Sequence, residues 1–309
     1  MSTADASLTG EQMPELRAAG TDLSERRRSG VSRGPLIDLT ALPGMVDIEW
    51  GADGAARISA LTTIAEIATD ARVAQAYPGL AAAAAGLATP QIRHIATLGG
   101  NLAQRSRCWY FRNPHIACLK KGGPICPARD GNHLYGVAFD LGPCVAPHPS
   151  TMAAALLAYD ATITTSLRQD LTVTQLLGDG ANGSADNMLK VGEIIRSIHL
   201  PSPLPGERAL YKRAISRTHA EWPLVELVAR AVVSTGHLAF ARVTAGGIAP
   251  VPLRLSAVES AMHGAAATTT TVSRAATQSN IGARPLPMTL YKLSLLRGLV
   301  EDLLGALIV

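Results

Sequence analysis

The alternation of apolar and polar positions predicts short strands in the first two thirds of the chain. Residues 35–39 and 56–61 are aliphatic runs interrupted by polar residues, and residues 162–167 are rich in β-branched side chains. Residues 192–200 alternate apolar and polar side chains as far as Pro201, which cannot donate a hydrogen bond to a sheet. We expect a short strand at each of these four positions.

Helical periodicity and helix-end signals lie between these strands. Thr63 and Glu66 form a capping box, which predicts a helix from there to about residue 76, ended by Pro78. Residues 265–279, rich in Ala, Thr and Ser, are expected to form a mobile loop or a poorly fixed helix. The other predicted elements are helices over residues 80–87, 151–158, 171–177, 224–233, 257–262 and 289–307 and a strand over residues 237–245.

Two adjacent glycines, Gly99 and Gly100, follow Thr97 and precede Asn101. This pattern predicts a tight turn into a helix, and such a turn exposes backbone N–H groups that can bind a phosphate. An ordinary glycine turn is the competing interpretation, and it is favoured when so short a motif is considered alone.

The composition is that of a globular protein with a buried core. Of 309 residues, 47% are hydrophobic and 17% are charged. This length predicts two or three domains. Residues 201–206 are rich in proline and resemble a linker, so we place the main boundary between residues 1–204 and residues 205–309.

The charge pattern gives no nucleic-acid signal. The net charge of +4 is dispersed, apart from the run Arg26, Arg27 and Arg28 with Arg33 nearby. A nucleic-acid interface needs a basic stripe or patch, ideally with interleaved aromatic residues. We interpret the run, which follows Glu25, as a solvated helix face and predict no nucleic-acid partner.

Membrane and export signals are also missing from the sequence. No run of 18 apolar residues occurs, so no membrane-spanning segment is predicted. Residues 1–16 are polar and acidic, without the apolar core of a signal peptide or a twin arginine. We expect a cytoplasmic protein, with export to the periplasm alongside a signal-bearing partner as the alternative.

Four cysteines, Cys108, Cys118, Cys126 and Cys144, lie in one segment, and the remaining chain has none. Residues 104–148 around them predict a loop insertion that is longer than a passive connection should be. Disulfides do not suit a cysteine-poor chain of this size without a signal peptide. Structural zinc sites usually use close cysteine pairs, which are missing here. An iron–sulfur cluster on four thiolates is the third interpretation, and the spacing alone favours neither metal site.

The residues around the cysteines suit a compact inorganic centre. Glycines and prolines allow the chain to wrap closely around it. Lys120, Lys121 and Arg129 can offset the negative charge of thiolate ligands. A lone loop histidine more often forms surface hydrogen bonds than ligates a metal. The alternative ligands are His115, His133 and His148.

A series of short motifs in this order resembles the FAD-binding subunits of the xanthine oxidase and carbon monoxide dehydrogenase families of molybdenum hydroxylases. The likeness runs from about Arg17 to Leu304, and the ordered series is more specific than any one motif. The motifs are residues 18–23 (AAGTDL), 36–39 (LIDL), 57–63 (RISALTT), 97–102 (TLGGNL), 148–150 (HPS), 192–195 (GEII), 246–250 (GGIAP) and Tyr291 with Lys292.

The cysteine segment narrows this resemblance. It is most similar to that of the aldehyde oxidoreductase flavin subunits and also resembles that of the 4-hydroxybenzoyl-CoA reductase flavin subunits. This resemblance, and not the spacing, implies a 4Fe-4S cluster. The implied ligands are Cys108, Cys118, Cys126 and Cys144.

The resemblance implies an α+β fold and a set of FAD contacts. A two-subdomain FAD-binding domain of the PCMH type should precede a smaller C-terminal α+β domain with a three-stranded sheet. The first motif and residues 97–101 should bind the pyrophosphate through backbone N–H groups, and Lys212 should border the flavin edge. The residues expected to contact FAD are Ala18, Ala19, Gly20, Thr21, Asp22, Leu23, Thr97, Gly99, Gly100, Asn101, Ser150, Glu193, Ile194 and Lys212.

The implied function is that of an oxidoreductase subunit. Its partners would be a large molybdenum-cofactor subunit and a small 2Fe-2S subunit, in a heterotrimer or its dimer. Electrons would pass from the 2Fe-2S clusters to FAD on this chain and then to an external acceptor. The alternatives are a scaffold subunit with a zinc or iron–sulfur site and no FAD, and a stand-alone flavoprotein reductase.

Two features depart from the family pattern. Ala19 replaces a usual glycine, and its methyl group is expected to crowd the phosphate or to shift the turn. The family's strand–helix unit before this motif is replaced by a polar lead of about sixteen residues, which predicts a missing or substituted first strand.

Overall fold

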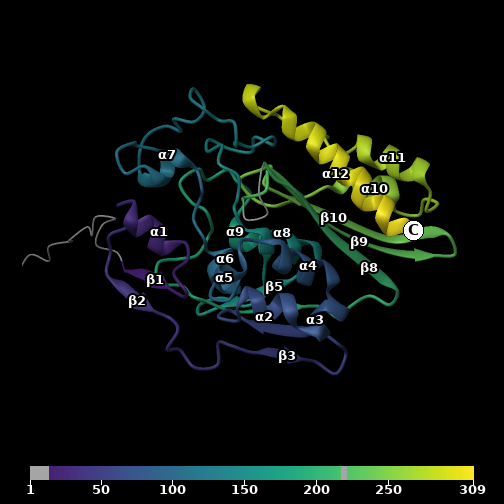
Figure 1. Ribbon diagram of the computed structural model, residues 1–309, viewed down its shortest axis with the longest axis horizontal. Helices are drawn as coiled ribbons and strands as arrows, with labels where there is room; N and C mark the ends of the chain where they lie inside the picture. The colour runs from purple at the N-terminus through teal and green to yellow at the C-terminus, as the bar shows by residue number, and fades with distance from the viewer. Residues whose placement is uncertain (1–13, 217–220) are drawn as a thin grey trace, which may run out of the picture.

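A small parallel sheet begins the described part of the computed structural model, which covers residues 14–216 and 221–309. In it, β1 (Glu15–Arg17) pairs with β2 (Leu36–Asp38), and α1 (Leu23–Arg28) lies between them in the chain (Figure 1). β1 directly precedes the first glycine motif, and no helix separates the two, so the expectation that the family's strand–helix unit is missing or substituted stays a prediction. Residues 1–13, most of the polar lead, lie outside the described residues.

A five-stranded sheet follows, with the order β3-β4-β7-β5-β6 and antiparallel neighbours throughout. Ile58, Ile163 and Ile198 pair across its three central strands and are fully buried, which fixes the register of the inward face. The predicted strands correspond to β4, β5 and β7, whereas β3 was not predicted. The strands are β3 (Ile48–Trp50), β4 (Ala56–Ser59), β5 (Thr162–Thr165), β6 (Leu171–Thr172) and β7 (Ile195–Leu200).

The predicted helix after Thr63 is divided in two. The capping box with Glu66 forms as expected and starts α2 (Ile64–Thr69). Asp70 is extended, and its carboxylate accepts the Val73 N–H at 2.8 Å, which starts α3 (Ala71–Ala76). Pro78 does not simply end a helix, because it occupies the first turn of α4 (Pro78–Gly86), where a missing N–H leaves no bond unmade.

Short helices complete this part of the chain. α5 (Pro90–Arg93) and α6 (Leu98–Leu102) precede the cysteine segment, and α8 (Thr151–Ala158) and α9 (Val173–Leu177) follow it. Within the described residues, the cysteine segment contains α7 (Trp109–Arg112) and one 3-10 turn, η1 (Leu119–Lys121), and no strand. The segment is therefore mostly irregular, and its being an insertion stays a prediction.

The C-terminal sheet has four antiparallel strands in the order β11-β10-β9-β8. They are β8 (Glu207–Ala214), β9 (Val225–Ser234), β10 (His237–Gly246) and β11 (Leu253–Arg254). The α+β class is confirmed, but the expected count of three strands is wrong, because the short β11 pairs with the end of β10.

The predicted helix over residues 224–233 is wrong, because this segment is β9. Val225, Leu227, Ala229 and Ala231 face the hydrophobic core of the C-terminal part (the second core), while Val228 faces that of the N-terminal part (the first core). Both faces are buried, so simple alternation is lost. Glu226 and Arg230 are four residues apart, a spacing that also suits the polar side of a helix.

Three helices cover one side of the C-terminal sheet. α12 (Tyr291–Ile308) packs on β8 and β9, and α10 (Ser256–Met262) packs on β10 (Figure 1). α11 (Thr269–Thr277) packs between α10 and α12. The expected mobile loop over residues 265–279 is therefore wrong, since Val272, Ala275 and Ala276 form a buried stripe on α11.

The two hydrophobic cores meet at this sheet. α4 and α8 pack against β8, β9 and β10 from the first core. The Arg230 guanidinium donates to Ala158 O at 2.5 Å and forms two bonds, at 2.7 and 2.8 Å, with the Glu207 carboxylate. Among the described residues, no helix is both long and apolar enough to cross a membrane.

Candidate functional site

A cavity of about 130 Å³ lies where the first glycine motif meets α6 and the start of β7. It joins three segments that are far apart in the sequence. Of the residues expected to contact FAD, those that line it are Ala18, Ala19, Gly20, Thr21, Asp22, Leu23, Thr97, Gly99, Gly100, Glu193 and Ile194. The sequence did not indicate Arg17, Arg26 and Gln104, which also line it.

The turn before α1 presents unpaired backbone donors. The first bond of the helix runs from Ser24 N–H to Gly20 O at 2.7 Å. The N–H groups of residues 20–23 have no acceptor among the described residues. Consecutive free donors at a helix start suit an anion such as a phosphate, because the peptide dipoles also favour negative charge there.

Gly20 is the residue of this turn that requires glycine. Its φ is +78°, in the left-handed region that a Cβ disfavours. Ala19 is not among the described residues with positive φ, so its methyl group does not strain the backbone. The backbone of the turn therefore accommodates alanine in place of one of the two family glycines.

The two glycines of α6 serve close packing. They lie within the helix, which corrects the expectation of a turn that leads into it. A Cβ on Gly99 would meet the Ala60 Cβ at 2.8 Å and the Ala60 carbonyl oxygen at 3.1 Å. The Gly99 N–H donates to that oxygen at 2.8 Å, and the Gly100 N–H donates to Thr97 Oγ1 at 3.1 Å. Gly100 is the donor that can be released most easily, because its acceptor is a rotatable hydroxyl group.

Ser150 and Asn101 link helices and do not line the cavity. Ser150 Oγ donates to Asn101 Oδ1 at 2.7 Å and accepts the Ala153 N–H at 3.0 Å. This pair holds the start of α8 against α6 behind the cavity. The expected contact of Ser150 with the cofactor stays a prediction.

Glu193 contributes to the cavity as part of its wall. Its carboxylate accepts bonds from Arg168 at 2.8 and 2.9 Å, from the Thr165 hydroxyl at 2.5 Å and from the Lys190 N–H at 2.8 Å. The Arg168 bonds hold the pKa of Glu193 at about 2. Lys212 lies on β8, away from the cavity lining, and pairs with Asp302 at 2.7 Å.

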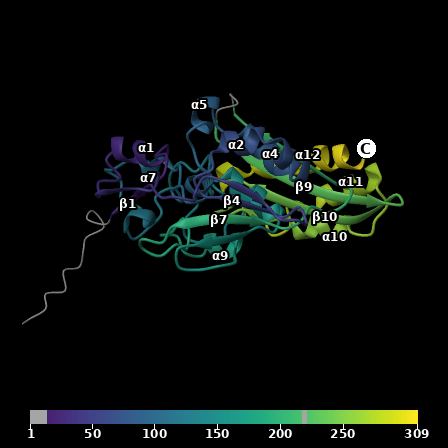
Figure 2. The ribbon, with the colours of Figure 1, turned by 90° about the horizontal axis from the view of Figure 1, so that it is seen from below.

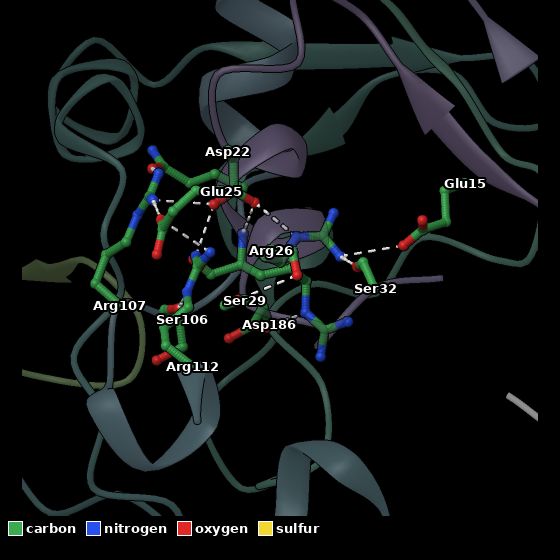
Figure 3. Close-up of polar contacts among 12 residues, drawn as sticks. Glu15, Asp22, Glu25, Arg26, Ser29, Ser32, Ser106, Arg107, Arg112 and Asp186 are labelled. Atoms are coloured by element: carbon green, nitrogen blue, oxygen red, sulfur yellow. Dashed lines mark hydrogen bonds and ion pairs between the residues drawn. The ribbon is translucent and has the colours of Figure 1, made fainter. Parts of the chain in front are cut away.

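Asp22 connects the turn to the cysteine segment (Figure 3). Its carboxylate accepts Arg112 Nη2 at 2.6 Å, the Arg105 N–H at 3.1 Å and Arg26 Nε at 3.1 Å, and Arg107 Nη1 lies 3.1 Å away. Burial raises the pKa of Asp22, but Arg107 and Arg112 outweigh that effect and hold the pKa below its usual value. The Asp22 carboxylate is therefore held in ion pairs with the arginines.

This network corrects the interpretation of the arginine run as a solvated helix face for Arg26 and Arg27, whereas Arg28 and Arg33 are exposed. Arg26 pairs with Asp22 and lies 3.5 Å from Glu15, and Arg27 pairs with Glu15 at 2.8 Å. Both side chains are partly buried. In two views at right angles, α1 and α7 lie side by side, at the end of the molecule away from α10 and α11 (Figures 1 and 2).

The cysteine sulfurs lie among backbone donors. The hydrogen bond between the thiol groups of Cys126 and Cys144 lowers the pKa of Cys126 and raises that of Cys144. The Cys126 sulfur also accepts the N–H groups of Ala128 and Val145, and burial raises the pKa of Cys108, whose sulfur accepts two further N–H groups. Hydrogen bonds of this kind stabilise thiolates and tune iron–sulfur centres.

The described residues show no ligand set for a single metal ion. No three of their His, Cys, Asp and Glu side chains converge in that way. A single zinc ion requires all its sulfur ligands at about 2.3 Å from one centre. His133 is already engaged, because Nδ1 bonds to Gly131 O at 2.9 Å and Nε2 accepts the Met288 N–H at 3.3 Å.

A second cavity, of about 310 Å³, lies between the cysteine segment and the C-terminal part, and Arg107 lines it. Trp109, Tyr135 and Trp222 also line it, and the Arg107 guanidinium lies 4.4 Å from the centre of the Trp222 ring. Buried Lys292 borders it and donates to Gly247 O at 2.7 Å, and burial lowers its pKa to about 7. The sequence pointed to Lys292 only through the final motif.

Two family models match the chain. Residues 4–203 match the FAD binding domain in molybdopterin dehydrogenase. Residues 209–306 match the CO dehydrogenase flavoprotein C-terminal domain. Together the two models cover nearly all of the chain.

One related protein matches over most of the chain, and another over about a third of it. The aldehyde oxidoreductase FAD-binding subunit PaoB of Escherichia coli K12 is 32% identical over 266 residues, which cover 83% of this chain and 82% of that protein. The xanthine dehydrogenase FAD-binding subunit of Escherichia coli O157:H7 is 33% identical over 96 residues, 31% of this chain and 33% of that protein.

Solved structures share the fold. A chain of carbon monoxide dehydrogenase from Hydrogenophaga pseudoflava superposes with a TM-score of 0.73 at 21% identity, over 95% of this chain and 89% of that one. A chain of quinoline 2-oxidoreductase from Pseudomonas putida 86 gives a TM-score of 0.72 at 18% identity, over 96% and 89%. At these identities the likeness concerns the fold.

Proposed function

Because the chain belongs to the FAD-binding subunits of the molybdenum hydroxylase family, we propose that it holds FAD at the cavity between α1 and α6 and relays electrons to an external acceptor. The observation that carries the proposal is the row of N–H groups at residues 20–23, which belong to the cavity lining and have no protein acceptor among the described residues. Such a row is chemically matched to a pyrophosphate.

Different residues of the cavity have different roles in binding FAD. The turn of residues 18–22 supplies the donors, and Gly20 allows its left-handed backbone. Gly99 permits α6 to approach β4, and Gly100 provides one further N–H when Thr97 rotates away. Ile194 supplies an apolar wall, and Glu193 fixes that wall through Arg168. Bound FAD would supply the redox chemistry, since it accepts and releases one or two electrons.

We further propose that the cysteine segment holds a 4Fe-4S cluster on Cys108, Cys118, Cys126 and Cys144. Cys118 and Cys144 are buried, and sulfurs of the set accept backbone N–H bonds, as cluster thiolates do. Lys120 and Arg129 place positive charge near Cys144. The resemblance to the aldehyde oxidoreductase subunits supports the same assignment.

The partners follow from the family. The relatives are named as subunits of aldehyde oxidoreductase and xanthine dehydrogenase. We propose that this chain assembles with a large molybdenum-cofactor subunit and a small 2Fe-2S subunit, which deliver electrons to it. The organic substrate would then be oxidised on the large subunit.

The test is an ultraviolet–visible spectrum of the purified chain, with flavin, iron and zinc assayed on the same sample. We expect flavin bands over broad iron–sulfur absorbance, with about four irons per chain. A sample with zinc and no flavin would instead identify a scaffold subunit. Flavin without iron would retain the FAD assignment and remove the cluster.

A further inference from the structure

Asp22 belongs both to the turn that faces the cavity and to the ion network of the cysteine segment. Only 12% of its side chain is exposed. Its two oxygens face three arginine side chains and one backbone N–H group (Figure 3). A shift of the turn would therefore move the acceptor of every one of these donors.

The donors lie on both sides of Cys108. Arg105 and Arg107 precede it, and Arg112 ends α7 after it. Arg112 also forms hydrogen bonds within the segment: it donates to Ser106 O at 2.8 Å and to Arg105 O at 3.0 Å. Glu25, one turn along α1, accepts Arg107 at 2.8 Å and Arg112 at 3.1 Å. Two carboxylates of one helix thus fix the turn that carries Cys108.

A third carboxylate, that of Asp186, also binds the segment. Buried Asp186 pairs with Arg105 and accepts Lys120 Nζ at 2.7 Å. It lies outside α1 and does not line the cavity at the first motif. Asp22 and Glu25 thus join the start of α1 to the cysteine segment, and Asp186 holds Arg105 and Lys120 of that segment independently of α1.

We propose that Asp22 is a positioning residue that couples the occupancy of the FAD cavity to the order of residues 105–112. An anion bound to the N–H groups of residues 20–23 would fix the start of α1, and the Asp22 carboxylate would transmit that order to Arg105, Arg107 and Arg112. The coupling is reciprocal, so order in the cysteine segment raises the affinity for FAD by the same factor. This inference rests on the proposed function, because it takes FAD as the ligand.

The test measures hydrogen exchange of residues 105–112 in the full chain, with and without saturating FAD. We expect FAD to slow this exchange about fivefold or more in the wild type, the lower end of typical couplings. In Asp22→Asn we expect this effect to vanish at saturating FAD and the Kd for FAD to rise about tenfold. Direct contact between flavin and the segment would instead leave the FAD effect intact in the variant, and that result would overturn the proposal.

Two further variants make the test specific. Asp160→Asn is the control, because it also removes the charge of an aspartate that pairs with an arginine. Asp160 pairs at 2.6 Å with Arg242, which lies in the C-terminal part. It should retain the full FAD effect, whereas a generally loosened protein would lose it in both variants. Glu25→Gln removes a more exposed carboxylate and should reduce the effect partially, which keeps the test valid if Asp22→Asn does not fold.

The failure of the proposed function would look different. If the wild type binds no FAD, that function is excluded, and the positioning role is then decided on the FAD-free chain. Faster exchange of residues 105–112 in Asp22→Asn than in Asp160→Asn would support Asp22 as the residue that orders the segment. Equal exchange in the two variants would overturn it.

Discussion

Gly99→Ala is expected to destabilise the protein, although alanine is the better helix former. The new Cβ would lie 2.8 Å from the Ala60 Cβ and 3.1 Å from the Ala60 carbonyl oxygen. Carbon atoms in contact are normally about 3.5–4.0 Å apart, so α6 would have to move by roughly 1 Å. Ala60 cannot yield easily, because its own N–H is bonded to Arg196 O at 2.9 Å.

The magnitude follows from three contributions. Overpacking of this kind typically costs about 1–3 kcal/mol. Movement of α6 also weakens the bond from Gly99 N–H to Ala60 O, worth about 1 kcal/mol. The higher helix propensity of alanine returns about 0.5–1 kcal/mol. Together these contributions predict a net loss of about 2 kcal/mol in the free energy of unfolding.

Urea denaturation measures this loss, and two companion variants test its cause. Gly298→Ala lies on α12, where a Cβ would meet nothing within 4 Å, so it should stabilise by about 0.5–1 kcal/mol. Ala60→Gly combined with Gly99→Ala removes the 2.8 Å contact but leaves the carbonyl oxygen, so it should recover part of the loss. A Gly99→Ala protein as stable as the wild type would refute the packing role of Gly99.

Three further outcomes are expected. Burial raises the pKa of Glu226, which accepts the Tyr211 hydroxyl at 2.9 Å, to about 7. The contribution of protonated Glu226 to stability is therefore complete below pH 4.5 and is lost as the pH rises through 7. Urea unfolding at a series of pH values should show that the free energy of unfolding falls by about 3 kcal/mol over this range, and Glu226→Gln should abolish that fall. Glu207→Gln leaves the buried Arg230 without its full charge partner, so the free energy of unfolding in urea should fall by about 3 kcal/mol. Cys126→Ser should abolish iron binding but retain flavin, and unchanged iron content would exclude Cys126 as a ligand.

Local signals predicted much of the first part of the fold. The capping box at Thr63 depends on neighbouring residues alone, and the strand β4 has a clear bounded pattern, so both were found. β9 was assigned wrongly because its conformation depends on helices that cover both faces. The division at Asp70 was missed, since a residue that ends one helix and caps the next resembles an ordinary helical residue in sequence.

For the candidate site, too, the sequence indicated local motifs but not contacts between distant residues. The ordered motifs indicated residues 18–23 and 97–101, and the fold brings most of them to one cavity. Asp186 and Glu25 gave no signal, because their roles depend on arginines far away in the sequence. Ala19 was expected to crowd the phosphate or to shift the turn; the left-handed residue is Gly20, so Ala19 does not strain the backbone, and the crowding of the phosphate stays a prediction.

The flavin-to-protein ratio of purified wild type and Gly100→Asp tests the FAD assignment most directly. A Cβ at residue 100 would lie 2.9 Å from Thr97 Oγ1, which must rotate away, and 3.8 Å from the Ala18 Cβ, so the variant places a negative charge at the cavity assigned to the pyrophosphate. Gly298→Asp, on the exposed side of α12, is the matched control. We expect about one FAD per chain in the wild type and the control, and a loss of FAD in Gly100→Asp with the far-ultraviolet circular dichroism unchanged. Full flavin content in Gly100→Asp, or none in the wild type, would contradict the assignment.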